Sequence, residues 1–344
     1  MHSINSTLRS ILKVAIVILN WNGKALLEKF LPSVVKYSID EATIYVADNN
    51  SSDDSISFLE NTYPEIKIVK NKINGGYAKG YNDALQHIDA DVYALVNSDI
   101  EVTKNWLKPI IKQFKSNNNI AAIQPKLLDY KNKSKFEYAG AAGGFVDFMG
   151  YPYCKGRIFM ELENDEKQFD DNYNIFWATG ACFFIRSNVF HQLKGFDEDY
   201  FAHQEEIDLC WRIQNEGYKI QYVGASKVYH VGGATLQETN PHKTFLNFRN
   251  SLFTICKNVP KRFVFIVIFF RLILDGVAGI KFLFELRPIH TWSIIKAHLS
   301  FYKNLPKMIK KRRFISFKQT KYYNTFSIVW QHFILRKDKF SDIN

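Results

Sequence analysis

The first 125 residues alternate between short apolar runs and longer stretches in which apolar residues recur with helical spacing. Five of the apolar runs are rich in β-branched residues, as expected of strands: 14–19, 43–48, 66–69, 92–96 and 120–123. Helical patterns lie between or after them: 23–38, 53–63, 77–88 and 104–117. Alternation of strand and helix predicts an α/β fold with a parallel sheet and helices on both faces.

The pattern changes twice further along the chain. Residues 130–175 are rich in glycine and aromatic residues and predict loops and short strands, whereas residues 175–223 predict a strand, two helices and a final strand. After about residue 245 the chain consists of helical segments. We therefore expect an α/β domain over residues 1–250 and a separate helical region over residues 251–344.

Charge divides the chain at almost the same place. The 344 residues are 47% hydrophobic, enough for a large core, and carry a formal charge of +11. Residues 241–344 contain 20 Lys and Arg but only 4 Asp and Glu, so the basic excess belongs to the helical region.

The helical region also contains a strongly apolar run, at residues 263–274, interrupted by Arg271. Its twelve residues are short of the roughly 20 that span a bilayer. We expect an interfacial or re-entrant helical hairpin over residues 263–284, with the basic cluster 307–313 attracted to an anionic membrane surface. Packing of these helices on the α/β domain or on a second copy of the chain is the alternative.

The cysteines indicate the compartment. Cys154, Cys182, Cys210 and Cys256 are widely spaced and form no C-x-x-C pair, which favours reduced thiols in the cytosol. The N-terminal apolar run is a predicted strand, and no signal peptide is evident. We expect a cytoplasmic protein peripheral to the inner face of the cell membrane.

Polar residues gather where the predicted strands end, which is where ligands bind in such sheets. Asn20 and Asp48 follow two of the strands, and the cluster 51–54 after Asp48 is also typical of a helix N-cap. Glycines at positions 75, 76 and 80 surround a helix start, where backbone N–H groups bind phosphate or simply form a tight turn.

Carboxylates and a histidine provide candidate chemistry. Asp99, in the sequence Asn97-Ser98-Asp99, is a hard oxygen ligand suited to Mg²⁺ or Mn²⁺. Glu205 and Asp208 share a helix face while Glu206 points elsewhere, and mutual repulsion of three acids raises a pKa toward the range of a general base. The alternative for these acids is a structural role, in which they complement the dipole at the start of the helix. His230 ends a predicted strand, and a structural role is the alternative for it as well.

Seven of these segments, in this order, resemble the family 2 glycosyltransferases, particularly their bacterial rhamnosyltransferase-like branch. The resemblance covers residues 13 to about 255. The segments are VAIVILNWNG, VADNNSSDDS, NGGYAKGYNDAL, LVNSDIEV, WATGACFFIRSNVF, GFDEDYFAHQEEIDLCWRI and VYHVGGAT.

The resemblance implies a GT-A fold, with a Rossmann-like mixed sheet, and a nucleotide-diphosphate-sugar donor. It implies nucleobase contact at Asp48, a metal bound by Asp99 and His230, and Glu206 as the base that deprotonates the acceptor. The donor site would comprise Asn20, Asp48, Asn74, Gly75, Gly76, Gly80, Asn82, Asn97 and Ser98, with Glu205 and Asp208 supporting the base or the acceptor. Asn97 replaces the first acid of the family's D-x-D motif, and Glu206 stands where Asp is common.

The implied reaction is inverting transfer of a sugar, rhamnose first, to a polyprenyl-linked or growing surface glycan. Homo-oligomerisation stays open. A nucleic-acid-binding protein is disfavoured by the apolar runs of the basic region, and a nucleotide-sugar oxidoreductase by the absence of G-x-G-x-x-G after the first strand. A catalytically inactive relative that binds nucleotide sugar or glycan stays as the alternative.

Overall fold

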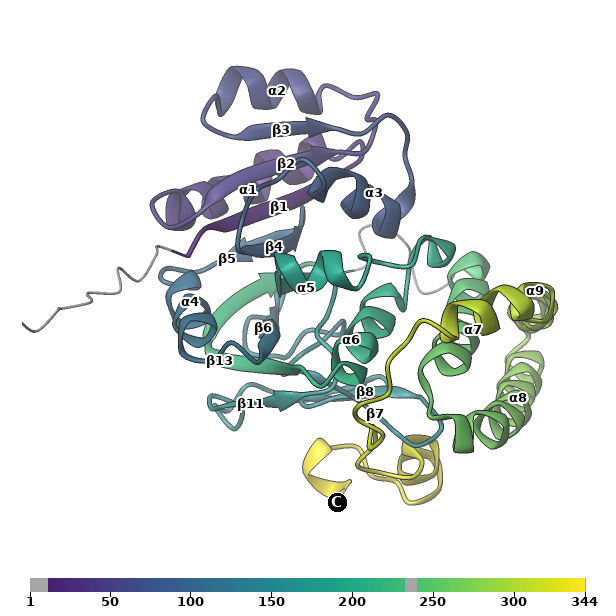
Figure 1. The fold of residues 1–344 in the computed structure, drawn as a ribbon. Helices are drawn as coiled ribbons and strands as arrows, with labels where there is room; N and C mark the ends of the chain where they lie inside the picture. Colours follow the sequence, from purple (N-terminus) through teal and green to yellow (C-terminus); the bar gives the residue numbers. More distant parts are fainter. Residues whose placement is uncertain (1–11, 233–239, 344) are drawn as a thin grey trace, which may run out of the picture.

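A mixed β-sheet forms the centre of the protein (Figure 1). The computed structural model describes residues 12–232 and 240–343. Residues 1–11 at the N-terminus and 233–239, which include the end of the last family-like segment, lie outside the described residues. The order of the strands in the sheet is β11-β13-β6-β12-β4-β1-β2-β3, and β5 pairs with β13.

Strands occur where the apolar runs predict them, and additional ones follow. The main sheet contains β1 (Val14–Asn20), β2 (Thr43–Asp48), β3 (Lys67–Lys70), β4 (Val92–Asn97), β5 (Ile100–Val102), β6 (Ile120–Asp129), β11 (Asn172–Ile175), β12 (Cys182–Arg186) and β13 (Lys219–His230). A small antiparallel sheet contains β7 (Gly144–Val146), β8 (Pro152–Cys154), β9 (Arg157–Ile158) and β10 (Glu161–Leu162).

Helices connect and flank these strands. Those of the first 240 residues are α1 (Lys24–Ser38), α2 (Ser55–Thr62), α3 (Gly76–Leu85), α4 (Leu107–Ser116), α5 (Ser187–Gln192), the short η1 (Glu198–Tyr200) and α6 (Glu205–Asn215). The C-terminal region contains α7 (Pro241–Asn258), α8 (Lys261–Phe284), α9 (Pro288–Arg312), η2 (Trp330–Ile334) and η3 (Phe340–Asp342).

Alternating side chains of the central strands build two hydrophobic cores, one on each face of the sheet. In β1, Ala15 and Val17 pack with α3 and α6, whereas Ile16 and Ile18 pack with α1 and α4. This two-residue period follows from the pleat of a strand, and burial of both faces explains why the runs are continuously apolar. The α/β prediction is confirmed.

The first four strands in sequence, β1 to β4, pair in parallel, whereas β12 runs antiparallel to both β4 and β6. The sheet is therefore mixed, as the family resemblance implies. The strand–helix alternation alone predicts a parallel sheet. All four cysteines are buried free thiols, as their spacing predicts.

The apolar run of the C-terminal region differs from its prediction. It does not fold back within residues 263–284. It is part of one 24-residue helix, α8, which continues through Arg271 and Asp275, and the chain turns at residues 285–287 into α9. Within the described residues, α8 is the helix whose length and composition would allow it to cross a membrane.

Candidate active site

The ends of three adjacent strands bring the first predicted residues together. Asn20 lies opposite Asp48 in the β1–β2 pairing, and Asn97 lies opposite Leu19 in the β1–β4 pairing. The Asn20 amide donates to Asp48 Oδ1 over 3.3 Å, and Asp48 Oδ2 accepts from the backbone N–H of Ser51 at 3.0 Å. These contacts fix a buried carboxylate at the carboxyl edge of the sheet.

A network of asparagine side chains shapes the neighbouring loop. Asn49 donates to Asn74 Oδ1 over 2.9 Å and to the Gly76 carbonyl over 3.1 Å, while Asn71 donates to Asn49 and to the Gly80 carbonyl. A Cβ on Gly80 would lie 3.0 Å from the Asn49 amide, so the close approach of α3 to this edge favours glycine there.

The glycine-rich turn contacts the loop that precedes α6. Gly76 has φ +73°, and a Cβ there would lie 2.7 Å from the carbonyl oxygen of Phe201. Tyr77 donates its backbone N–H to that carbonyl over 3.1 Å and its hydroxyl to the Gly180 carbonyl over 2.7 Å. The two loops therefore meet at a point that only glycine fits.

Asp99 and His230, far apart in sequence, lie side by side. Their carboxylate Oδ1 and imidazole Nε2 are 3.2 Å apart because β5 pairs with the end of β13. On the other side of the ring, Nδ1 is 3.1 Å from Glu137 Oε1. All three side chains are buried.

The two carboxylates control the charge of the imidazole. Burial alone would lower the pKa of His230, but the charge of Glu137 and hydrogen bonds to Asp99 and Glu137 outweigh it and raise that pKa to about 10. The ring is then an imidazolium between two carboxylates.

This arrangement fits a divalent cation. The described residues contain no group of three or more His, Cys, Asp or Glu side chains arranged around one metal position. Asp99 and His230 can still supply one oxygen and one nitrogen, with Nε2 exchanging its proton for the metal. Hard cations commonly take their other ligands from substrate phosphates and water. Glu137 would orient the imidazole through Nδ1, as carboxylates do at histidine metal sites.

Two glutamates begin α6 directly after a strained loop. Phe201, His203 and Gln204 all have positive φ, of 63°, 68° and 73°. Burial raises the pKa of Glu206 to about 7, and burial together with the charge of Glu206 raises that of Glu205 well above its usual range. Among the described residues, neither buried Oε2 atom has a hydrogen-bond partner.

A single asparagine side chain holds this loop. Asn250 of α7 is fully buried, and its amide donates to the carbonyls of Tyr200, Ala202 and His203 over 3.1, 2.9 and 2.7 Å. Because a loop of left-handed residues is costly to maintain, these bonds stabilise the conformation that presents Glu205 and Glu206.

Comparison with known proteins identifies the fold and its chemistry. The sequence model of glycosyl transferase family 2 matches residues 15–194, more than half of the chain. The chain belongs to this family.

Relatives of this glycosyltransferase act on several glycans. It is 24% identical to the N-acetylglucosaminyl-diphospho-decaprenol L-rhamnosyltransferase of Mycobacterium tuberculosis over 59% of this chain and 71% of that protein. It is 23% identical to the low-salt glycan biosynthesis hexosyltransferase Agl10 of Haloferax volcanii, over 69% of this chain and 73% of the relative.

Solved structures share the GT-A fold. The crystal structure of GalNAc-T7 with UDP, GalNAc and Mn²⁺ has a TM-score of 0.55 at 18% identity; the match covers 72% of this glycosyltransferase and 48% of that chain. The mannosyltransferase PcManGT from Pyrobaculum calidifontis, in complex with GDP-Man and Mn²⁺, has a TM-score of 0.50 at 13% identity and matches 88% of this chain and 84% of its own.

Two of the predicted site residues have their polar atoms engaged by other parts of the protein. Asn82 forms two 2.9 Å hydrogen bonds with the backbone of Phe196, so its amide ties α3 to the loop before η1. Asp208 is fully buried and pairs with Arg212 at 2.9 Å and Lys257 at 2.8 Å. We leave both out of the substrate site, because their polar atoms are already engaged.

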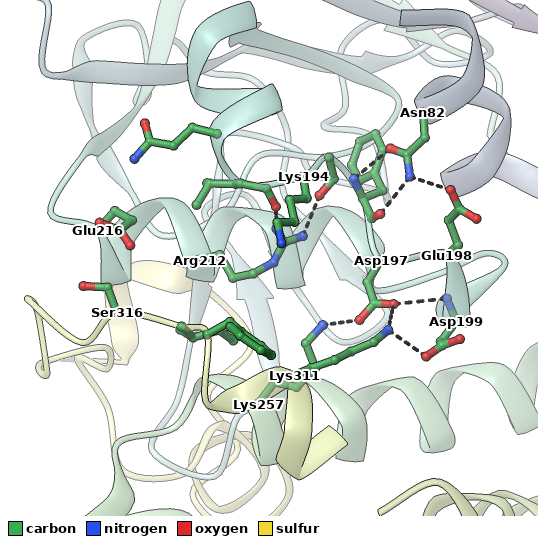
Figure 2. A pocket seen from close by; sticks show the side chains of 16 residues that line it. Asn82, Lys194, Asp197, Glu198, Asp199, Arg212, Glu216, Lys257, Lys311 and Ser316 are labelled. Carbon is green, nitrogen blue, oxygen red and sulfur yellow. Dashed lines mark hydrogen bonds and ion pairs between the residues drawn. The ribbon is translucent and has the colours of Figure 1, made fainter. Parts of the chain in front are cut away.

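Asn82 lines a cavity of about 470 Å³, and so do Arg212 and Lys257, the two partners of Asp208 (Figure 2). Lys257 and Lys311 both pair with Asp197, and Lys311 also reaches Asp199 at 2.7 Å. This cavity is distinct from the strand ends, and none of the Asp99, Glu137, Glu206 and His230 side chains lines it. The ion pairs of Lys311 tie the end of α9 to the segment that leads into the α6 loop.

The contacts of the basic cluster 307–313, which contains five lysines and arginines, bear on the membrane prediction. Lys307 pairs with Asp199, Lys311 with Asp197 and Asp199, and Arg312 donates to the Cys256 and Lys257 carbonyls. Lys310 and Arg313 stay exposed. Three of the five basic side chains thus form contacts within the protein, and attraction of the cluster to an anionic membrane surface stays a prediction.

Proposed function

We propose that this glycosyltransferase transfers a sugar from a nucleotide-diphosphate donor to an acceptor hydroxyl, with inversion at the anomeric carbon and with the help of Mg²⁺ or Mn²⁺. One observation carries the proposal. The glycine-rich turn beside the Asn20–Asp48 edge meets the loop that leads into Glu205 and Glu206, through the hydrogen bond from the Tyr77 backbone to the Phe201 carbonyl, and the same sheet brings Asp99 and His230 into contact.

Each part of the site has a role in this reaction. Asp48 and Asn20 would bind the nucleobase, while the turn at Asn74, Gly75 and Gly76 and the residues Gly80, Asn97 and Ser98 would line the diphosphate and sugar. Asp99 and His230 would hold the cation, which neutralises the charge that develops on the departing diphosphate.

The base is a protein carboxylate. Glu206 would accept the proton of the acceptor hydroxyl as its oxygen attacks the anomeric carbon from the face opposite the diphosphate. Its unpartnered Oε2 and a pKa of about 7 suit this task. A single displacement of this kind needs no covalent intermediate.

The donor sugar and acceptor are inferred from relatives. The mycobacterial relative is an N-acetylglucosaminyl-diphospho-decaprenol L-rhamnosyltransferase. We therefore take rhamnose from dTDP-rhamnose as the first donor to test and a polyprenyl-diphosphate-linked or growing surface glycan as the acceptor class. Such an acceptor would place the enzyme at the cytoplasmic face of the membrane.

Thermal-shift measurements with a panel of nucleotide diphosphates and nucleotide sugars test the donor site. A ligand that binds only the folded protein raises the melting temperature. We expect one nucleotide to raise it in the presence of Mn²⁺ and a much smaller shift in the Asp99→Ala variant. Manganese-independent shifts would remove Asp99 from the site, and no shift with any nucleotide would favour an inactive glycan-binding relative.

A further inference from the structure

The outer face of the α8–α9 hairpin is apolar. On α8, the exposed side chains of Phe265, Phe269, Ile273, Val277, Ile280 and Phe284 recur every three or four residues, which forms one stripe along the helix. Phe265 and Phe284 are 81% and 85% exposed. On α9, Trp292, Leu299 and Tyr302 are also exposed, and Figure 1 shows the two helices together at the edge of the molecule away from β1–β3. We call these side chains the hairpin face.

Midway along α8, two ionisable residues lie on its inner face, Arg271 and Asp275. Arg271 is buried, donates to Asp275 Oδ1 over 2.9 Å and stacks on the Tyr151 ring at 3.5 Å. His298 of α9 contacts the other oxygen of Asp275 at 3.1 Å. A helix on a surface that faces water normally presents ionisable side chains to the water and apolar side chains to the core. In the middle of α8 this arrangement is reversed, because Arg271 and Asp275 face inward while Phe269 and Ile273 are exposed.

Positive charge surrounds the hairpin face. Lys261 and Arg262 are exposed at the start of α8, and Lys296 and Lys303 are exposed on α9. Over residues 259–313 the two acids are Asp275, which is buried, and Glu285, which pairs with Lys281 at 2.9 Å. The exposed rim is thus strongly basic.

Contacts along α8 fix its orientation. Phe263, near its start, packs edge-on against Phe148 at 5.4 Å, Arg271 contacts Tyr151, and Gly279 accepts a hydrogen bond from Thr291 at 2.7 Å. Because these contacts are distributed along the helix, its inner side is packed against the rest of the protein. Only its outer side is free to contact a membrane or a partner.

We propose that the hairpin face lies in one leaflet of a membrane that contains anionic phospholipid, with α8 and α9 parallel to the surface. Such helices bury their apolar side to about 5–10 Å, while lysines and arginines contact the lipid headgroups. A symmetric dimer through the same face would bring two basic rims together, which disfavours a second copy as the occupant. Binding requires neither donor nor acceptor, so its test is independent of the transfer reaction.

Co-sedimentation of the full chain with vesicles tests the proposal. The double variant Phe265→Gln/Phe269→Gln removes two side chains from the hairpin face, and Ile39→Gln, 40% exposed after α1, is the matched control. We expect wild type and control to sediment with phosphatidylcholine–phosphatidylglycerol vesicles and the double variant to bind at least about tenfold more weakly. Pure phosphatidylcholine should bind wild type less.

Fluorescence provides a second measurement. Lipids brominated in their acyl chains should quench the emission of the bound protein, and Trp292→Phe should remove most of that quenching. The proposal is overturned if the double variant, with an unchanged melting temperature, sediments as wild type does. A wild-type dimer in solution that the double variant converts to monomer would also overturn it in favour of a second copy.

Discussion

The carboxyl group of Glu206 combines burial with an unpartnered oxygen at the start of α6. Replacement by Gln keeps the size of the side chain but removes the ability to accept a proton. We expect kcat to fall by about 10²–10⁴-fold in Glu206→Gln while donor affinity changes little. Glu216→Gln, at the other end of the same helix where Glu216 pairs with Lys318, is the control for steady-state kinetics.

The pH dependence of turnover provides the counter-test for Glu206. Because burial raises its pKa to about 7, the base is protonated and inactive below that pH and becomes active above it. Turnover in the wild type should rise between pH 6 and 8. A flat profile, or one that Glu206→Gln retains, would assign the base to another residue.

Glu137 is expected to act on the cation through His230. Replacement by Gln removes the negative charge of the carboxylate that lies beside Nδ1 of the imidazole. Changes of this kind lower metal affinity by about 10–100-fold. Titration of Mn²⁺ in the presence of the bound nucleotide measures this directly. Glu101→Gln, on β5 close to Asp99 in sequence, should leave the affinity unchanged, because Glu101 pairs with Lys133 at the surface. Equal affinities in the two variants would contradict a positioning role for Glu137.

The sequence predicted residues at strand ends better than residues in irregular segments. Asp99 and His230 were paired by resemblance, and the structure places them in contact because both adjoin the β5–β13 pairing. Glu137 lies between β6 and β7 in a segment without periodicity, so no pattern indicated its position. Asn82 is of a residue type that commonly binds ligands. Its side-chain amide instead forms hydrogen bonds with the backbone of Phe196, which is distant in sequence.

At the scale of elements, the α6 loop depends on α7. In Asn250→Ala the carbonyls of Tyr200, Ala202 and His203 lose a common donor, and the left-handed residues between them lose their support. We expect a loss of about 1–3 kcal/mol in the free energy of unfolding. Because Glu206 follows this loop, kcat should fall while the KM for the donor changes less.

A matched variant separates positioning from stability. Asn304→Ala on α9 also removes an amide donor, which bonds the Ser300 carbonyl at 2.8 Å, but it does not touch the α6 loop. Steady-state kinetics and thermal melting of both variants are compared. If Asn250→Ala lowers only the melting temperature, and its kcat and pH profile match those of Asn304→Ala, the loop does not need Asn250 to present the base.

The elements were predictable where one local pattern determines them. The short apolar runs rich in β-branched residues at β1, β2 and β4 and the helical spacing in α1 and α4 match the structure within a few residues. The length of α8 was not predictable in the same way, because Arg271 and Asp275 interrupt the apolar run. Their contacts with Tyr151 and His298, which come from other elements, allow the helix to continue.

At the scale of the whole molecule, the C-terminal region shares the core of the sheet domain. Val264 and Val267 of α8, and Tyr322, Ile328 and Ile343 after α9, belong to the same hydrophobic cluster as the α3 and α6 side of the sheet. The tail after α9 also supplies the Ile328 backbone N–H that bonds Asp147 at 2.8 Å. A boundary at residue 250 therefore divides the chain by composition, whereas the hydrophobic core extends across it.

Asp147 lies in this contact region and makes the stability of the whole protein depend on pH. Burial raises its pKa to about 7, against hydrogen bonds from the Ile328 and Tyr151 backbone and the charge of Arg271. Because the folded state binds this proton more tightly than the unfolded chain does, the stabilisation is complete below the usual carboxyl pKa. It is lost as pH rises through about 7.

We therefore expect the free energy of unfolding of Asp147→Asn to change less between pH 5 and 8 than that of the wild type. Between these two pH values the difference amounts to at most about 3 kcal/mol, out of the roughly 4 kcal/mol that corresponds to a pKa moved from 3.8 to about 7. Urea unfolding of both proteins at a series of pH values between 5 and 8 measures these free energies. Because Glu205 and Glu206 are present in both proteins, the difference between the two pH series isolates the contribution of Asp147. Parallel series would show that Asp147 stays ionised, which means that Arg271 and the two backbone donors outweigh its burial.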